Sequence, residues 1–189
     1  MTVRPLPELP DVLQLRRRVF ADDRGWFREL WRANEAAALG LPDAFVQDNV
    51  SFSRRGVLRG LHYQHPYGQG KLVTALVGRI YDVAVDLRRG SPTFGRWVGV
   101  ELDAAEGTML YLPPGFAHGF LALTDPAVVL YKCTDYYRPE ADRTVAWNDP
   151  QLAIAWPLEG PPLLSPKDAT APCLGQLPPE ALPDDDTAG

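Results

Sequence analysis

The sequence has few cysteines and no long apolar run, and each scarcity excludes a class of protein. Its two cysteines, Cys133 and Cys173, lie far apart with no CxxC pair, so we expect two free thiols and neither a disulfide framework nor a structural zinc site. No apolar stretch approaches the roughly 18 residues that span a bilayer. Residues 1–5 also lack the apolar core of a signal peptide. We therefore expect a cytoplasmic protein that does not enter a membrane.

The chain also lacks an excess of positive charge. Its formal net charge is −5 at pH 7, whereas a nucleic-acid-binding protein carries a basic surface. We therefore expect no nucleic-acid partner. A small phosphorylated ligand stays compatible with this charge, because it needs only a local group of arginines and lysines.

What the chain has is the composition of one globular domain rich in turns. Of its 189 residues, 46% are apolar and 23% are charged, which is enough for a packed core. Sixteen glycines and 19 prolines occur without a G-X-Y period. Such a composition is typical of many short strands joined by turns and disfavours a helical bundle.

Short apolar segments separated by turn signals run from residue 46 to about residue 137. Their spacing of roughly 8–12 residues predicts an all-β sandwich or barrel. Gly78 and Arg79 look like the two-residue turn of a hairpin. Before this region we expect a strand over residues 13–20 and one short helix over residues 34–39, stopped by Gly40. The other strands are expected over residues 57–64, 72–77, 80–87, 97–102, 109–112, 120–123 and 128–133.

The chain is expected to form a single domain over residues 1–176. Residues 1–31 have mixed character, and the N-terminal arm of the domain is expected over about residues 1–33. From residue 177 the sequence reads LPPEALPDDDTAG, which is acidic, rich in proline and poor in apolar residues. We therefore predict a flexible tail over residues 177–189.

Two of the three histidines lie in spacings that resemble the cupins, which are small jelly-roll barrels. The first cupin motif, G-x5-H-x-H, is matched except that Gln64 replaces its second histidine. The second motif, G-x5-P-x-G-x2-H, is matched throughout. Two imidazoles and an amide form a poor metal cage, so no metal is expected. The matching positions are Gly56 and His62 in the first motif and Gly107, Pro113, Gly115 and His118 in the second.

Further motifs occur in order along the chain. Together they closely resemble the dTDP-4-dehydrorhamnose 3,5-epimerase family, over roughly residues 13–174. The motifs are residues 48–51 (DNVS), 57–64 (VLRGLHYQ), 69–73 (QGKLV), 82–86 (DVAVD), 91–95 (SPTFG), 114–120 (PGFAHGF), 130–132 (LYK), 135–137 (DYY), 147–150 (WNDP) and 164–168 (LSPKD).

This resemblance implies a cupin-like double-stranded β-helix, or jelly roll, with a few short helices. It implies an isomerase that needs no cofactor and acts on a dTDP-linked 4-keto-6-deoxyhexose. The ketone acidifies the C–H bonds at C3 and C5 on either side of it. A base removes one proton, an enolate forms, and an acid returns a proton to the opposite face.

The resemblance assigns the catalytic roles to four residues. His62 matches the family's base, and an imidazole with a near-neutral pKa suits that role. Asp168 would hold its tautomer and stabilise the imidazolium that forms. Tyr131 matches the acid, and Lys71 would stabilise the developing oxyanion at O4.

The resemblance also assigns the substrate-binding residues and a partner. Arg59 and Arg24 would bind the diphosphate, since Arg suits bidentate phosphate contacts. The family's N-terminal arm crosses to the neighbouring subunit, which implies a homodimer with exchanged arms. The substrate-binding positions are Arg24, Phe27, Glu29, Gln47, Asn49, Arg59, His118, Tyr137, Asp142 and Lys167.

Two features depart from a simple match. Asp142 stands where the family usually has Glu, one methylene longer, and Glu140 is a nearby substitute. Strict alternation along a strand also places Arg59 and His62 on opposite faces. Both point into one cavity only if Gly60 marks a bulge or the strand twists there.

Three alternatives stay open from the sequence. The first is a mono-epimerase that inverts C3 or C5 alone, because the same residues support it. The second is a metal-dependent cupin such as a dioxygenase or an isomerase. The third is a barrel that binds a sugar nucleotide without catalysis. Product NMR, metal analysis and solvent-deuterium exchange would distinguish these three from the double epimerase.

Overall fold

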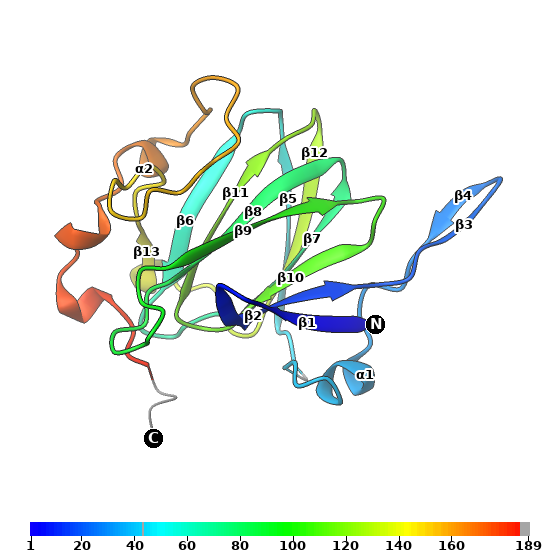
Figure 1. Cartoon of the computed structure of the whole chain (residues 1–189), viewed down its shortest axis with the longest axis horizontal. Coiled ribbons are helices and arrows are strands. Elements are labelled where there is room, and N and C mark those ends of the chain that lie inside the picture. The colour runs from blue at the N-terminus through cyan, green and yellow to red at the C-terminus, as the bar shows by residue number, and fades with distance from the viewer. Residues whose placement is uncertain (43, 186–189) are drawn as a thin grey trace.

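The computed structural model describes residues 1–42 and 44–185, and its main strands form two antiparallel sheets packed face to face (Figure 1). This confirms the prediction of an all-β jelly roll. One sheet has the order β1 (Thr2–Leu6), β2 (Leu9–Arg16), β10 (Thr108–Leu112), β7 (Lys71–Val77), β12 (Ala127–Cys133) and β5 (Gln47–Ser53). The other has the order β13 (Asp142–Thr144), β6 (Leu58–Gln64), β11 (Phe116–Ala122), β8 (Arg79–Asp86) and β9 (Trp97–Asp103).

The remaining elements are short. No helix within residues 1–42 and 44–185 has the length and apolar character needed to cross a membrane. A separate hairpin consists of β3 (Phe20–Asp22) and β4 (Gly25–Phe27). The helices are α1 (Ala33–Ala37), α2 (Pro166–Ala169), and the 3₁₀ turns η1 (Pro139–Ala141), η2 (Leu174–Gln176) and η3 (Pro179–Ala181).

The main core lies between the two sheets. Residues at alternate positions of each strand point inward, such as Val73 on β7, Leu110 on β10 and Phe120 on β11, all of them buried. Burial of each such side chain contributes about 1.5–3 kcal/mol. The core fills one part of the sandwich and leaves the rest of the inner faces to polar residues.

The outer face of the five-stranded sheet is covered by the C-terminal part of the chain. Val83 and Val85 of β8 pack there with Val145, Leu152 and residues further along the chain. Even-numbered positions of β8 face the interior between the sheets instead. Both faces of β8 are therefore buried.

The prediction of a hairpin turn at Gly78 and Arg79 is wrong. Strand β7 pairs with β10 and β12, whereas β8 pairs with β11 and β9, so the chain crosses from one sheet to the other here. Gly78 has a φ of +71°, and a Cβ at this position would lie 2.0 Å from the Thr124 hydroxyl oxygen. The glycine therefore serves a tight crossover rather than a turn between paired strands.

Most other expected elements are present with shifted ends. The strand expected over residues 13–20 is β2, which begins earlier and ends at Arg16. Strand β11 begins at Phe116 instead of residue 120, so it includes His118. The expected helix is α1, and Gly40 follows it with a φ of +75°, as a glycine stop requires.

The prediction of a flexible tail from residue 177 is wrong for residues 177–185, which pack against the body of the protein. Leu182 is buried in the hydrophobic cluster on the outer face of the five-stranded sheet, which we call the outer core. The Tyr63 hydroxyl donates a hydrogen bond of 3.0 Å to the Ala181 carbonyl. The Arg89 backbone N–H donates to the Pro183 carbonyl at 2.8 Å. Leucines spaced among prolines therefore pack here despite the acidic composition. The rest of the predicted tail, residues 186–189, lies outside the described residues.

The β3–β4 hairpin projects away from the body of the molecule (Figure 1). Its base is held by two buried arginines. The Arg17 guanidinium donates to the Leu30 carbonyl and binds Glu29, while the Arg28 guanidinium donates to the Ala104 carbonyl at 2.8 Å. The hairpin itself presents exposed aromatic side chains.

Candidate active site

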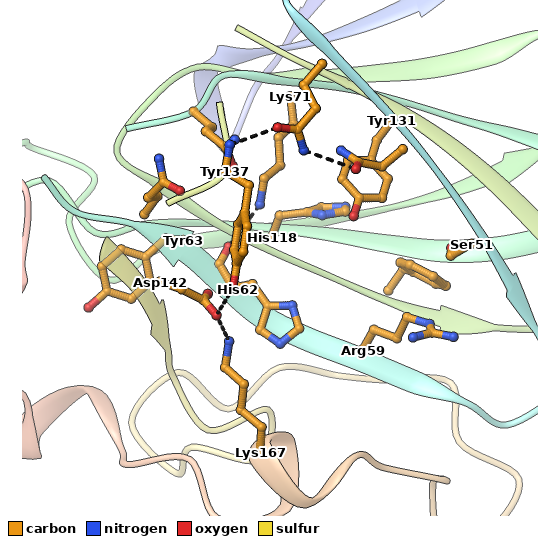
Figure 2. A pocket seen from close by; sticks show the side chains of 15 residues that line it. Ser51, Arg59, His62, Tyr63, Lys71, His118, Tyr131, Tyr137, Asp142 and Lys167 are labelled. Atoms are coloured by element: carbon orange, nitrogen blue, oxygen red, sulfur yellow. Dashed lines mark hydrogen bonds and ion pairs between the residues drawn. The ribbon is translucent and has the colours of Figure 1, made fainter. Parts of the chain in front are cut away.

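A cavity of about 420 Å³ opens between the two sheets, beside the main core (Figure 2). It receives side chains from both sheets and from α2, so residues far apart in the sequence meet there. The lining residues are Gln47, Asn49, Ser51, Arg59, His62, Tyr63, Gln64, Gln69, Lys71, His118, Phe120, Tyr131, Tyr137, Asp142 and Lys167.

His62 and Asp168 form a dyad at the wall of this cavity. The Nε2 atom of His62 lies 2.6 Å from Oδ1 of Asp168, which is 3% exposed. Ser165 begins α2 by accepting a hydrogen bond from the Asp168 backbone N–H, which fixes the aspartate on its four-residue helix. Since Nε2 is engaged, Nδ1 is the ring nitrogen left to exchange a proton with a ligand.

The surroundings of Asp168 favour its charged form. Burial alone raises its pKa, but the hydrogen bond and charge of His62, together with hydrogen bonds from Ser165 and the Gly60 backbone, hold the pKa below its usual range. A stable carboxylate at this distance stabilises an imidazolium at His62. The dyad therefore has the chemistry of a general base.

A bulge brings Arg59 and His62 to the same cavity. Between β11 and β6, His118 pairs with His62 but Phe120 pairs with Arg59, so β6 carries one extra residue. Gly60 lies at this point with a φ of +126°, and a Cβ there would lie 2.5 Å from the Gly119 Cα. Only glycine fits this close approach, and the extra residue resolves the alternation that separates the two side chains.

His118 forms a second histidine–aspartate pair. Its Nε2 atom lies 2.6 Å from Oδ1 of Asp82, which is fully buried. His118 and His62 are paired residues on neighbouring strands, so the two imidazoles lie side by side on one wall. The other carboxylate oxygen of Asp82, Oδ2, has no hydrogen-bond partner among the described residues.

Lys71 reaches the same region from the other sheet. Its Nζ atom donates to the His62 carbonyl at 3.3 Å, and the side chain is almost fully buried. Burial lowers the pKa of the Lys71 ammonium, an effect opposed by Cys133, Asp142 and Asp82. A desolvated cation interacts strongly with a nearby developing anion, because little water screens it.

Tyr131 projects from β12, in the sheet that faces His62. Burial raises the pKa of its hydroxyl, and Cys133 raises it further, while Arg59 lowers it. The phenol therefore stays protonated at neutral pH. The imidazole and the phenol enter the cavity from opposite walls (Figure 2).

Three side chains that line the cavity are joined to one another (Figure 2). Asp142 Oδ2 accepts hydrogen bonds from Lys167 Nζ at 2.5 Å and from the Tyr137 hydroxyl at 3.2 Å. The shorter side chain of Asp142 therefore still reaches both neighbours, and Glu140 has no part in these two contacts.

Of the remaining residues expected to bind the substrate, some line the cavity and others lie on the N-terminal arm. Gln47 donates to the Asn49 side chain at 3.1 Å on the inner face of β5. Arg24, Phe27 and Glu29 do not reach the cavity of their own chain. Arg24 pairs with Asp22 on the exposed hairpin, Phe27 is 68% exposed, and Glu29 binds Arg17 and Arg32.

Five cavity residues were not expected from the sequence. Ser51 continues the inward alternation of Gln47 and Asn49 along β5, which was a usable signal. Gln64 was visible as the residue that replaces a cupin histidine. The other three lie inside the motifs 57–64, 69–73 and 114–120, but no role was assigned to them there. The five are Ser51, Tyr63, Gln64, Gln69 and Phe120.

The described part of the chain brings no three His, Cys, Asp or Glu side chains close enough together to hold a metal ion. The first cupin motif shows why in structural terms. His62 uses Nε2 for Asp168, and the Gln64 amide is bonded to backbone groups through both its nitrogen and its oxygen.

Comparison with known proteins places the chain in a family. The family model described as dTDP-4-dehydrorhamnose 3,5-epimerase matches residues 7–176. The dTDP-4-dehydrorhamnose 3,5-epimerase of Pseudomonas aeruginosa is 57% identical over 162 residues, which cover 85% of this chain and 89% of that protein. The structure of dTDP-6-deoxy-D-glucose-3,5-epimerase from Legionella pneumophila, in complex with dTDP-4-keto-L-rhamnose, has a TM-score of 0.94 at 47% identity, covering 97% of this chain and 98% of that one.

A second solved structure has a narrower activity in its name. It is a 3′-monoepimerase from Streptomyces bikiniensis in complex with dTDP-quinovose, with a TM-score of 0.88 at 40% identity. The match covers 96% of this chain and 92% of that one. From the family model and these relatives, the chain belongs to the dTDP-4-dehydrorhamnose 3,5-epimerase family.

Proposed function

We propose that this protein is a dTDP-4-dehydrorhamnose 3,5-epimerase. It converts dTDP-4-dehydro-6-deoxy-D-glucose into dTDP-4-dehydro-L-rhamnose, an intermediate towards dTDP-L-rhamnose, by inverting C3 and C5 without a cofactor. The observation that carries the proposal is the His62–Asp168 dyad facing Tyr131 across a cavity large enough for a hexose. The 57% identity to the Pseudomonas aeruginosa enzyme supports the same substrate.

The reaction begins with proton removal beside the ketone. His62 takes the proton from C3 or C5 through Nδ1, since Asp168 occupies Nε2. Asp168 then stabilises the imidazolium as an ion pair of 2.6 Å. General-base catalysis of this kind contributes about 10²–10⁴-fold to the rate.

The electrons of the broken C–H bond move into the ketone and give an enolate. Lys71 stabilises its oxygen, O4, with an ammonium group, and His118, whose Nε2 is engaged with Asp82, contacts the substrate near the same carbonyl. The Tyr131 hydroxyl then delivers a proton to the opposite face of the same carbon, and the ketone re-forms. The inverted centre keeps its composition, because one proton leaves and one proton enters.

The rest of the cavity binds the nucleotide and orients the sugar. Arg59 supplies the cation for the diphosphate. The polar and aromatic residues around it hold the remaining groups of the substrate. These residues are Gln47, Asn49, Tyr137, Asp142 and Lys167.

We also propose that the active unit is a homodimer with exchanged arms. Phe20, Trp26 and Phe27 are about half exposed or more on the hairpin, and Val50 and Phe52 are exposed on the outer face of β5. Such apolar surface favours contact with a second copy of the chain.

The arm would bring Arg24, Phe27 and Glu29 to the partner's cavity. Light scattering measures the oligomeric state directly. In a mixed dimer purified through two tags, one His62→Ala subunit and one Arg24→Ala subunit should restore one intact site, or about half of wild-type turnover per dimer. A monomer, or a mixed dimer without activity, would refute arm exchange.

A single domain that includes the packed residues 177–185, and the cytoplasmic location, belong to the same proposal. Both fit a small biosynthetic enzyme that acts on a nucleotide sugar. Limited proteolysis and cell fractionation test them.

The main alternative function is that of a mono-epimerase. The structural similarity to the 3′-monoepimerase, with a TM-score of 0.88, supports this alternative. The test is NMR of the reaction in D₂O with purified protein. The double epimerase places deuterium at both C3 and C5 and yields the L-rhamno product. Deuterium at one carbon identifies a mono-epimerase, and dTDP binding with no exchange identifies a binding protein. Activity lost to a chelator and restored by a metal ion would indicate a metal-dependent cupin.

A further inference from the structure

The loop over residues 135–138 carries Tyr137 to the opening of the cavity. It follows β12 and belongs to no helix or strand, so its backbone groups have no ladder partners. Tyr136 and Tyr137 are both more than half exposed. A loop of this kind keeps one conformation only if other groups satisfy its backbone hydrogen bonds.

Three glutamine side chains supply four of those bonds, and the Asp135 carboxylate accepts from the Tyr136 backbone N–H. The Gln69 amide donates to the Asp135 carbonyl at 2.8 Å, and the Tyr137 backbone N–H donates to the Gln47 side chain at 2.8 Å. Gln64 supplies the other two bonds. Four consecutive residues of the loop are therefore each held by a glutamine that lines the cavity.

Gln64 has the central place among the three. Its amide nitrogen donates to the Tyr136 carbonyl at 3.2 Å, and its oxygen accepts from the Arg138 backbone N–H at 2.8 Å. The same nitrogen donates to the Tyr67 carbonyl at 2.5 Å. Gln64 thus holds Tyr137 from both sides.

The chemistry of position 64 requires an amide. It must donate to two carbonyls and accept from one N–H, and among side chains of this size only glutamine does both with fixed geometry. A glutamate has no donor, and a neutral histidine has one. This explains why Gln64 stands where the cupin motif has a metal-binding histidine. Because Gln64 lies two residues after His62 on β6, it also ties the loop to the strand of the catalytic base.

We propose that Gln64 and Gln69 are positioning residues that hold the 135–138 loop so that Tyr137, bonded to Asp142, closes over the bound sugar nucleotide. The proposal rests on the proposed function, because it assigns Tyr137 to substrate binding. In this arrangement the loop is ordered before the substrate arrives, so binding does not have to order it.

Removal of these bonds affects binding more than chemistry. Gln64→Leu keeps the size of the side chain and removes both amide groups. The loss of two or three hydrogen bonds predicts an increase in KM of about 10- to 100-fold. The turnover number should fall about threefold or less, because the dyad is intact. A variant that merely folds poorly would instead show a lower kcat at unchanged KM.

The test compares Gln64→Leu and Gln69→Leu with Gln14→Leu. Gln14 lies on β2, away from the cavity, and its side chain accepts from Arg4. Kinetics give KM and kcat, and native-state hydrogen exchange gives the protection of the Tyr137 and Arg138 amides. Exchange at these two amides should accelerate about tenfold or more in Gln64→Leu and stay unchanged in Gln14→Leu.

Unchanged protection of these amides in a folded Gln64→Leu variant would overturn the proposal, as would a loss of kcat without a change in KM. If Gln64→Leu does not fold, Gln69→Leu decides by the same measurements, with a smaller expected increase in KM of about 3- to 10-fold. Hydrogen exchange needs no activity. Failure of the positioning role is therefore distinguishable from failure of the proposed function, which is tested by wild-type epimerisation alone.

Discussion

Asp168→Asn should remove most of the epimerase activity while leaving the shape of the site intact. The substitution replaces one oxygen of the buried Asp168 carboxylate by an NH₂ group. In the wild type, Oδ1 of this carboxylate lies 2.6 Å from Nε2 of His62. The carboxylate receives hydrogen bonds from both His62 and the Gly60 backbone N–H. The amide has one oxygen for these two donors. When that oxygen accepts from Gly60, the NH₂ group faces Nε2 and leaves the hydrogen of the imidazole on Nδ1.

The expected magnitude follows from two effects. Loss of a hydrogen bond to a charged group costs about 1.5–3 kcal/mol, or about 10- to 150-fold in rate. The wrong tautomer adds to this loss, because Nδ1 then carries a hydrogen and cannot accept another. The corresponding change in a Ser-His-Asp triad lowers kcat about 10⁴-fold. We therefore expect a fall in kcat of about 10²- to 10⁴-fold, with KM changed by less than about fivefold.

The assay is deuterium incorporation at C3 and C5 in D₂O, followed by NMR. Asp48→Asn is the matched control, since Asp48 is an exposed carboxylate on β5 that pairs with Lys132 outside the cavity. Turnover by Asp168→Asn within about threefold of the wild type would refute the dyad as the base. Circular dichroism shows whether the variant is folded.

The same substitution changes the response of stability to pH. The pKa of Asp168 lies below its ordinary value of 3.8 in the folded protein. Its charge therefore stabilises the fold above that ordinary value, and the stabilisation is lost as the pH falls through the lowered pKa. Asp168→Asn should lack this part of the acid destabilisation. An identical loss of Tm from pH 6 to pH 3 in both proteins would contradict the shift.

Three further predictions test other parts of the site and the fold. Tyr131→Phe should slow formation of the inverted product about 10²-fold or more while proton exchange on the original face continues, which NMR in D₂O distinguishes. Lys71→Met should lower kcat about 10²- to 10³-fold, as expected for loss of a group that stabilises an oxyanion, and steady-state kinetics measure this. Leu182→Ala should lower the free energy of unfolding by about 2–5 kcal/mol in chemical denaturation, because Leu182 is buried in the outer core, whereas a flexible tail would give no change.

The strands were predictable because local signals specify them. The strand expected over residues 80–87 is present as β8, and glycine and proline marked most turns. The helix before Gly40 was predictable for the same reason. Each of these features depends on residues that are neighbours in the sequence.

Features that depend on distant neighbours were not predictable. The pair Gly78–Arg79 has hairpin composition, but the flanking strands find their partners in two different sheets, which local sequence does not encode. The order of residues 177–185 depends on a hydrophobic surface built by β6 and β8. Composition alone describes that segment as a tail.

In the candidate site, too, some features could be predicted from the sequence and others depend on residues that are distant in it. The chemistry of His62, Asp168, Tyr131 and Lys71 came from motif resemblance, and the structure brings all four to one cavity region. The bulge at Gly60 was a stated condition for Arg59 and His62 to share that cavity, and it is present. Ser51 follows the alternation along β5, which is a local signal, whereas the role of Gln69 depends on the loop that it contacts across the cavity.

Gln64 connects the departure from the metal-binding motif to the chemistry of the site. In a metal-binding barrel, histidines of the first motif direct ring nitrogens at one ion. Here His62 turns one nitrogen to a buried carboxylate, and Gln64 uses its amide to hold a loop over the cavity. The aspartate leaves Nδ1 of the imidazole free to accept a proton, whereas a divalent ion would occupy its lone pair. Glutamine at position 64 therefore suits a cavity that moves protons with its own side chains. The position that carries a histidine in the cupin motif here holds the loop beside the cavity.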